Sequence, residues 1–261
     1  MHNSAGRKYE STRIPNSVLP WHPQLNTTHS VAKPTKHHRK KKKAEPADST
    51  ELRIIGGNLR GSKLRYEHFQ QGGDPVTRPM KHRVREAIFN LISIESAGKH
   101  VIDLFAGTGA LGLEALSRGS LSATFIERHV PTARVIEENI AMLGLTDRSQ
   151  LLVTSAFLWA KRDLPNADSP SSQPAVPNPS IPLPWLVFCS PPYSFYSERQ
   201  QEMLDLIEQV LDRAPAESIL VVEADTSFDF NLLRGGVADT REENCWLVRS
   251  YPPAVVGIWR K

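Results

Sequence analysis

The chain has 261 residues, 39% of them hydrophobic, which is enough for one domain with a substantial core and some appended segments. Its formal net charge is +4, but residues 1–50 hold ten Lys/Arg and three Asp/Glu, a net of +7, so the remainder carries −3. The basic excess therefore belongs to the first 50 residues, and the overall charge does not by itself identify a nucleic-acid-binding protein.

Membrane insertion and export are not expected. No apolar run reaches the roughly 18 residues that span a membrane, and the first residues show no signal-peptide pattern. The two cysteines are too few for a disulfide framework, which favours a cytoplasmic protein with reduced thiols.

Residues 1–50 combine few large apolar residues with several prolines and the basic run Lys36–Lys43. Such a segment buries too little surface to offset the entropy of ordering it, so we predict a disordered tail. The basic run suits contact with RNA phosphates, but it could equally be a solvated tail without a specific role.

A short β hairpin with glycine turns is predicted at Leu52–Leu64, within an N-terminal extension over residues 51–78. Residues 51–90 hold eight Lys/Arg against four Asp/Glu and form the only locally basic part of the expected folded body. Pro79 is expected to open a helix with arginines on its surface, which could dock RNA or simply be its solvated face. The candidates for RNA binding are Arg53, Arg60, Arg78, Arg83 and Arg85.

Strands and helices alternate along the main domain, residues 79–261. The expected strands are Val101–Phe105, Ala123–Glu127, Leu151–Thr154, Trp185–Cys189 and Ser218–Glu223, and the expected helices are Ala110–Ser117, Pro131–Leu143 and Glu198–Leu211. This alternation predicts an α/β fold with a doubly wound, mainly parallel sheet. Two closing strands, Cys245–Ser250 and Ala254–Arg260, indicate an antiparallel edge. Residues 165–184 contain seven prolines and are interpreted as an insertion, either without function or serving as a lid.

The segment Asp103–Gly112 joins an expected strand to an expected helix. Three glycines in it fit the spacing G-x-G-x-x-G: Gly107, Gly109 and Gly112. Glu127 ends the next strand, where its carboxylate can accept both hydroxyls of a ribose. On spacing alone an NAD-dependent dehydrogenase stays open. Asp103 favours S-adenosylmethionine, because a carboxylate at this position suits a cationic methionyl ammonium better than a pyrophosphate.

The tetrapeptide Ser190-Pro191-Pro192-Tyr193 directly follows an apolar strand, so we expect it beside the glycine turn at the carboxyl edge of the sheet. Its prolines fix the backbone and remove two N–H donors, which lets carbonyl groups face a substrate amino group. Tyr193 offers a flat face for stacking a base. The alternative for Ser190 is an ordinary turn serine at a strand end.

This tetrapeptide resembles the (Asp/Asn/Ser)-Pro-Pro-(Tyr/Phe) motif of methyltransferases that act on exocyclic amino groups of nucleic-acid bases. Together with Arg53–Gly57, Arg78-Pro79, Arg83–Glu86 and Asp103–Ala115, it resembles the bacterial 16S ribosomal RNA guanine-N2 methyltransferase family over about residues 52–260. The resemblance implies a Rossmann-like class I methyltransferase fold with an antiparallel final strand, and S-adenosylmethionine as the methyl donor.

The resemblance also implies residue roles. The implied cofactor contacts are Asp103, Phe105, Gly107, Gly109, Glu127, Ser155 and Ala156, and the implied catalytic residues are Ser190, Pro191, Pro192 and Tyr193. The family usually has Asp or Asn where this chain has Ser155, and Asp where it has Ser190. A hydroxyl at the latter position occurs in some cytosine-N4 methyltransferases of DNA, so it leaves catalysis open and puts the target base in question.

The predicted function is methylation of the exocyclic N2 amino group of a guanine in small-subunit ribosomal RNA. The Ser190 hydroxyl and the Pro191 carbonyl would accept its two N–H bonds and aim the nitrogen lone pair at the methyl group. We expect a monomer that needs no metal ion and whose partner is ribosomal RNA or the small ribosomal subunit. Three alternatives stay open: an adenine-N6 or cytosine-N4 methyltransferase of DNA or other RNA, a catalytically degenerate RNA-binding relative, and a dehydrogenase.

Overall fold

The computed structural model describes residues 51–67, 69–71, 74–75, 80–164 and 183–261. The predicted tail 1–50, the candidate Arg78, the helix-opening Pro79 and most of the proline-rich insertion lie outside the described residues. The predicted division into tail, extension and main domain therefore stays a prediction. Among the described residues, no helix has both the length and the apolar character needed to cross a membrane.

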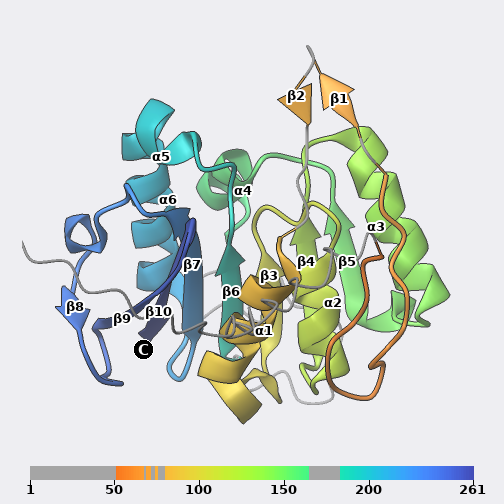
Figure 1. Cartoon of the computed structure of the whole chain (residues 1–261), viewed down its shortest axis with the longest axis horizontal. Coiled ribbons are helices and arrows are strands. Elements are labelled where there is room, and N and C mark those ends of the chain that lie inside the picture. Colours follow the sequence, from red (N-terminus) through yellow and green to blue (C-terminus); the bar gives the residue numbers. More distant parts are fainter. Residues whose placement is uncertain (1–50, 68, 72–73, 76–79, 165–182) are drawn as a thin grey trace, which may run out of the picture. The chain divides into compact units, whose positions relative to one another are not determined.

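An eight-stranded sheet has the order β5-β4-β3-β6-β7-β10-β9-β8 (Figure 1). The strands β5, β4, β3, β6 and β7 run parallel to one another, β10 is antiparallel to both β7 and β9, and β8 is parallel to β9. The strand bounds are His100–Asp103 (β3), Ser122–Ile126 (β4), Ser149–Leu152 (β5), Trp185–Cys189 (β6), Ile219–Asp225 (β7), Val237–Ala238 (β8), Trp246–Tyr251 (β9) and Ala254–Arg260 (β10). The predicted α/β class, with a mainly parallel sheet and an antiparallel final strand, is confirmed.

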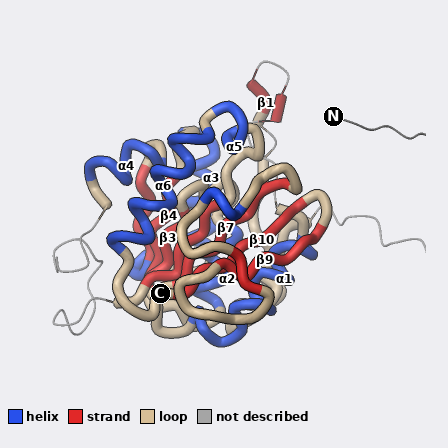
Figure 2. Tube along the Cα trace, turned by 90° about the vertical axis from the view of Figure 1, so that its left-hand side faces the viewer, coloured by secondary structure: helices blue, strands red, loops and turns tan. Residues whose placement is uncertain are grey.

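Helices cover both faces of this sheet. Two buried clusters lie on its opposite faces, one packed against α1, α2 and α3 and the other against α4, α5 and α6. In Figure 2, α4 and α6 lie on one side of the strands, and α1 and α2 lie on the other. The helix bounds are His82–Ile92 (α1), Ala110–Ser117 (α2), Val130–Met142 (α3), Ala156–Arg162 (α4), Phe195–Glu198 (α5) and Gln200–Arg213 (α6); short 3-10 turns cover Ser93–Ser96, Thr146–Arg148 and Phe230–Leu232.

The central strand β6 shows why the sequence folds this way. Trp185, Val187 and Cys189 belong to the cluster under α4–α6, and Leu186 and Phe188 to the cluster under α1–α3. Burying a large apolar side chain contributes about 1.5–3 kcal/mol, so a strand buried on both faces needs a continuous apolar run. That run made β6 predictable to the residue.

Other boundaries differ from the expected ones for local reasons. The helix expected at Glu198–Leu211 corresponds to α6, Gln200–Arg213; the short helix α5 before it was not expected, and Arg199 separates the two because its φ of −133° and ψ of 36° leave the helical region. The edge strand is also different: β10 lies inside the sheet, and β8 forms the edge. A strand of two residues has no periodic pattern, so nothing in the sequence indicated β8.

The predicted hairpin at Leu52–Leu64 folds back on itself, with a bridge between Arg53 and Lys63 and further backbone hydrogen bonds between its two arms. Its backbone is also held by the buried Glu114 of α2, whose carboxylate accepts hydrogen bonds from the N–H groups of Ile55 and Gly56, each at 2.7 Å. The extension is thus fastened to the helix that follows the glycine turn.

A second ribbon, β1 (Gln70–Gln71) with β2 (Asp74–Pro75), lies above the carboxyl edge of the sheet (Figures 1 and 2). The ring of Phe69 packs edge-on against His129 at a centroid distance of 5.3 Å, next to the start of α3. The extension therefore runs from α2 to the edge of the sheet where ligands of such folds bind.

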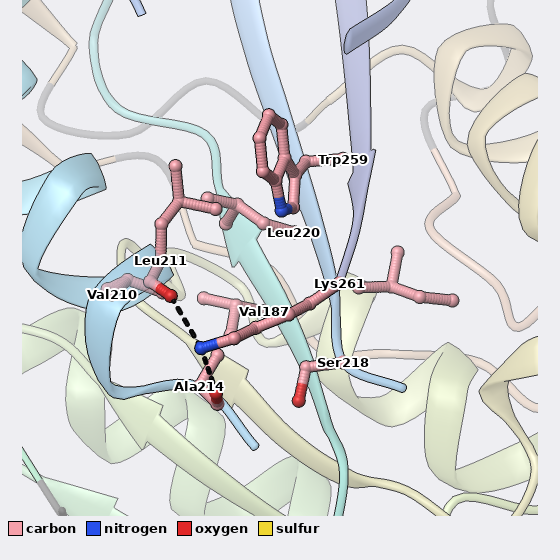
Figure 3. Close-up of a pocket in the computed structure, with 9 residues that line it drawn as sticks. Val187, Val210, Leu211, Ala214, Ser218, Leu220, Trp259 and Lys261 are labelled. Carbon is pink, nitrogen blue, oxygen red and sulfur yellow. Dashed lines mark hydrogen bonds between the residues drawn. The ribbon is translucent and has the colours of Figure 1, made fainter. Parts of the chain in front are cut away.

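A small apolar cavity lies at the opposite end of the sheet (Figure 3). There the Nζ of Lys261 donates hydrogen bonds to the carbonyl oxygens of Leu211 at 3.0 Å and Ala214 at 2.6 Å, where α6 ends. Its lining also includes Val187, Leu220 and Trp259. This cavity is a packing feature at the amino end of β7, away from the ligand-binding edge.

Candidate active site

The candidate site lies where the winding of the sheet reverses. β4 and β5 extend from β3 in one direction, and β7 extends from β6 in the other, so β3 and β6 flank a switch point. Open α/β sheets bind ligands in the crevice beyond the carboxyl ends of such a pair. The register places Asp103 of β3 beside Phe188 of β6, two residues before Ser190. The glycine turn and the tetrapeptide are therefore neighbours.

The turn after β3 depends on its glycines in two different ways. Gly107 and Gly109 have φ values of 52° and 75°, in the left-handed region where a side chain is strained. Gly112 has an ordinary backbone, but a Cβ there would lie 2.3 Å from Cε1 of Phe125. The first two glycines thus shape the turn, and the third lets α2 pack closely on β4.

Asp103 is buried at the carboxyl end of β3, with 1% of its surface exposed. Its Oδ2 accepts a hydrogen bond from the Gly112 N–H at 3.1 Å. Burial raises its pKa to about 7, the Gly112 hydrogen bond opposes this shift, and the nearby Glu127 adds to it. A cation next to this carboxyl would favour its ionised form, so Asp103 is poised to receive an ammonium group.

Glu127 follows β4 and is also buried. Its two carboxylate oxygens accept hydrogen bonds from the N–H groups of Gly107 at 3.0 Å and His129 at 2.7 Å. Burial raises its pKa, and these hydrogen bonds oppose the shift. Each oxygen keeps a further lone pair, so the carboxylate can still accept ribose hydroxyls. The same contact ties Glu127 to the glycine turn.

Three aromatic rings join the loops around this turn. Phe105 packs edge-on against Phe157, at a centroid distance of 5.9 Å, and Phe195 lies 6.2 Å and 6.0 Å from them respectively. The guanidinium of Arg199 stacks over Phe157 at 4.0 Å. The rings come from the turn after β3, the start of α4 and the start of α5, and they provide an apolar wall suited to adenine.

The start of α4 is held by its own cap. The hydroxyl of Ser155 accepts a hydrogen bond from the Leu158 N–H at 3.2 Å, and Ala156 behind it is buried. A buried carboxyl for an ammonium, a second carboxylate for a ribose and an apolar wall for an adenine together fit S-adenosylmethionine. An additional side chain at the glycine turn would strain it.

The tetrapeptide after β6 meets a carboxylate of β7. Cys189 pairs with Val222, so the residues that follow, Ser190 and Glu223, are neighbours. The Ser190 hydroxyl donates a hydrogen bond to Oε2 of Glu223, and the Tyr193 hydroxyl donates one to Oε1 at 2.7 Å. Burial and the hydrogen bond to Glu223 raise the pKa of Tyr193 well above its ordinary value.

A model described as "Conserved hypothetical protein 95" matches residues 52–244. The chain belongs to this family. It is 28% identical over 216 residues to a protein of Bacillus subtilis named "Putative rRNA methyltransferase YlbH", across 80% of this chain and 99% of the relative. It is 41% identical over 102 residues to "Ribosomal RNA small subunit methyltransferase D" of Escherichia coli, across 39% of this chain and 49% of the relative. The resemblance predicted from the sequence is confirmed.

Solved structures agree on the fold. "Putative methyltransferase yhhF from Escherichia coli" aligns with a TM-score of 0.57 at 23% identity, covering 80% of this chain and 96% of its own. A Thermus thermophilus 16S rRNA N2 G1207 methyltransferase, solved with AdoMet and guanosine, aligns with a TM-score of 0.54 at 15% identity, over 81% of this chain and 49% of its own. At these identities the likeness establishes the methyltransferase fold and nothing finer.

Sequence reasoning missed Glu223, the residue that joins Ser190 to Tyr193. The carboxylate is buried in β7 with 6% of the residue's surface exposed. An acidic residue inside the apolar run Ile219–Ala224 was the available signal, because a buried carboxylate is costly unless it is paired or used. Only the register of β6 against β7 shows which residues it serves.

The arginines proposed for RNA binding differ in their surroundings. Arg60 and Arg83 are exposed, although Arg83 donates a hydrogen bond to the carbonyl oxygen of Pro252. Arg53 is half-exposed and pairs with Glu51 at 2.5 Å. Arg78 lies outside the described residues. Of these, Arg60 and Arg83 are the better placed to meet a phosphate.

The expected surface position of Arg85 is wrong. Its side chain is 1% exposed, lies 4.0 Å from Glu114 and donates a hydrogen bond to the carbonyl oxygen of Arg53. Helical spacing placed it off the apolar stripe, but the docked hairpin covers that part of α1. Arg85 therefore braces the extension and is no longer a candidate for RNA contact.

Proposed function

We propose that this chain transfers a methyl group from S-adenosylmethionine to the exocyclic N2 amino group of a guanine in small-subunit ribosomal RNA. The observation that carries the proposal is the meeting of the glycine turn and the Ser-Pro-Pro-Tyr segment at the switch point, just beyond the paired residues Asp103 and Phe188. The names of the family members quoted above support the choice of ribosomal RNA.

When bound, the donor supplies a methyl group carried on its sulfonium, and the remainder of the donor is released as S-adenosylhomocysteine. On the proposed path the amine lone pair forms the new C–N bond, the electrons of the S–C bond return to sulfur, and the amine loses one proton. Asp103 holds the donor's ammonium, Glu127 its ribose, and the segment from Ser155 to Phe157 its adenine.

The amine itself is a poor nucleophile, because its lone pair is delocalised into the ring. The Ser190 hydroxyl and the Pro191 carbonyl accept its N–H bonds and turn the lone pair toward the methyl group, while Tyr193 lies beside the base. Positioning of this kind supplies up to about 7–11 kcal/mol in favourable cases. A base in a paired stem has to be unpaired or flipped first.

RNA docking is assigned to the basic extension, through the exposed Arg60, and to the neighbouring helix α1, through the exposed Arg83. The extension is fastened to α2 at one end and reaches the carboxyl edge at the other, through the contact of Phe69 with His129. Phosphate contacts made there would position the target base over the tetrapeptide.

The test is mass mapping of modified nucleosides in ribosomal RNA from cells with and without this protein. We expect one N2-methylguanosine of the small subunit to disappear and to return when purified protein and donor are added. A lost N6-methyladenosine or N4-methylcytidine would replace the proposed target base. An unchanged modification map, with no transfer in vitro, would favour the catalytically degenerate RNA-binding relative.

A further inference from the structure

The two hydroxyl groups nearest the proposed chemistry share one partner. Ser190 and Tyr193 each donate to a different oxygen of the Glu223 carboxylate, and the Tyr196 hydroxyl donates to the backbone carbonyl of Glu223 at 2.9 Å. Glu223 is buried, and Tyr196 beneath it is fully enclosed at 3% exposure. The carboxylate is thus fixed in place, and its orientation is set from two sides.

This arrangement determines what the hydroxyl groups can do. A hydroxyl has one proton to donate and two lone pairs to accept with. Because the protons of Ser190 and Tyr193 are committed to Glu223, both oxygens can act toward a substrate only as acceptors. A hydroxyl that donates to a carboxylate is also a stronger acceptor, since hydrogen bonds in a chain polarise one another.

We propose that Glu223 is a positioning residue that makes Ser190 and Tyr193 an acceptor-only rim, selective for a base edge that carries N–H groups. This inference rests on the proposed function and deepens it. The pairing edge of guanine presents a ring N–H directly beside its exocyclic amine, whereas adenine and cytosine present a ring nitrogen acceptor beside theirs. An acceptor-only rim therefore favours guanine.

The same contacts give the released proton a path. As the C–N bond forms, the amine proton moves to Oγ of Ser190, and the Ser190 proton moves to Oε2 of Glu223, which becomes a neutral carboxylic acid and later returns the proton to water. The family usually has Asp at the position of Ser190. In this chain the negative charge is on Glu223, which acts on the substrate through the hydroxyl of Ser190.

The experiment compares single-turnover methyl transfer to small-subunit RNA lacking the modification. Glu223→Gln keeps the size of the side chain and removes its charge, so we expect transfer to slow by about 10- to 100-fold, with unchanged affinity for S-adenosylhomocysteine and RNA. The matched control is Glu208→Gln. It removes the charge of a carboxylate on α6 that forms an exposed ion pair with Arg234, and it should leave the rate unchanged.

The decisive comparison repeats Glu223→Gln in a Ser190→Asp background. Asp at position 190 accepts the amine directly and takes its proton, so removing the charge at position 223 should then cost less than about threefold. A merely structural role for Glu223 predicts the same loss in both backgrounds. Equal losses, or a wild-type rate in Glu223→Gln alone, would overturn the inference.

A second variant covers the case in which Glu223→Gln does not fold. Tyr193→Phe keeps the ring and removes the hydroxyl, and we expect transfer to fall severalfold without loss of RNA affinity. Tyr193→Phe should also lower the ratio of the transfer rate to an RNA with guanine at the target position over the rate to an otherwise identical RNA with adenine there. An unchanged rate and preference in Tyr193→Phe count against the inference. A wild-type protein that binds RNA and cofactor but transfers nothing contradicts the proposed function itself, and the inference falls with it.

Discussion

Replacing Asp103 with Asn tests the proposed contact with the donor's ammonium. The amide keeps an oxygen to accept the Gly112 N–H, so the turn should persist, but it removes the charge. A hydrogen bond between charged groups contributes about 1.5–3 kcal/mol, and Asp103 is too deeply buried for solvent to screen it. We therefore expect the affinity for S-adenosylhomocysteine to fall about 10- to 150-fold.

The pH dependence gives the same prediction a second measurement. In the free protein Asp103 has a pKa of about 7, and an ammonium beside it lowers that value, so binding releases a proton when the pH is below the free-state pKa. The affinity of the wild type should rise as pH increases through 7, by at most about tenfold per pH unit.

The assay is isothermal titration calorimetry with S-adenosylhomocysteine, from about pH 5.5 to pH 8.5. In Asp103→Asn, most of the rise in affinity between about pH 5.5 and pH 7 should be lost. Asp147→Asn, at an exposed 3-10 turn, should behave like the wild type. Wild-type affinity in Asp103→Asn at neutral pH, or an equally steep rise of its affinity with pH, would refute the assignment of the ammonium to Asp103.

Three further outcomes are expected. Ser190→Ala should raise the barrier to methyl transfer by about 1–3 kcal/mol in single-turnover assays and leave cofactor binding intact, because one substrate N–H loses its acceptor. Arg60→Gln and Arg83→Gln should each reduce the slope of log affinity for RNA against log salt by about one, as measured by filter binding; an unchanged slope removes that arginine from the RNA contact. Glu114→Ala should lower the free energy of unfolding by about 3–5 kcal/mol in urea titrations, since it leaves the Arg85 charge buried without its partner; a cost near zero would show that the extension is held elsewhere.

The parts of the fold that were predictable are those determined by local sequence. The apolar run of β6, the glycine turn before α2 and the closing strand β10 each carry their own signal, and their bounds match the predicted ranges closely. Strand–helix alternation then led to the sheet class. The short edge strand β8 and the break at Arg199 have no such pattern, because tertiary contacts and a single backbone angle decide them.

Charged residues were harder to place than apolar ones. The helical pattern around Arg85 matched that of an amphipathic surface helix, and the side chain would be exposed on an isolated α1. It is buried because the extension, anchored by Glu114 of α2, folds over it. A prediction from one segment cannot include what another segment covers.

Glu223 shows the same limit at the candidate site. Asp103 and Ser190 stood out because each adjoins a recognisable motif, and their meeting follows from the order of parallel strands. Glu223 adjoins no motif, and it reaches Ser190 only because Cys189 is in register with Val222. A shift of one residue in that pairing would turn the carboxylate to the other face of the sheet, away from both hydroxyl groups. The chemistry proposed for Ser190 thus depends on strand register, which hydrophobic packing of β6 and β7 on both faces holds in place.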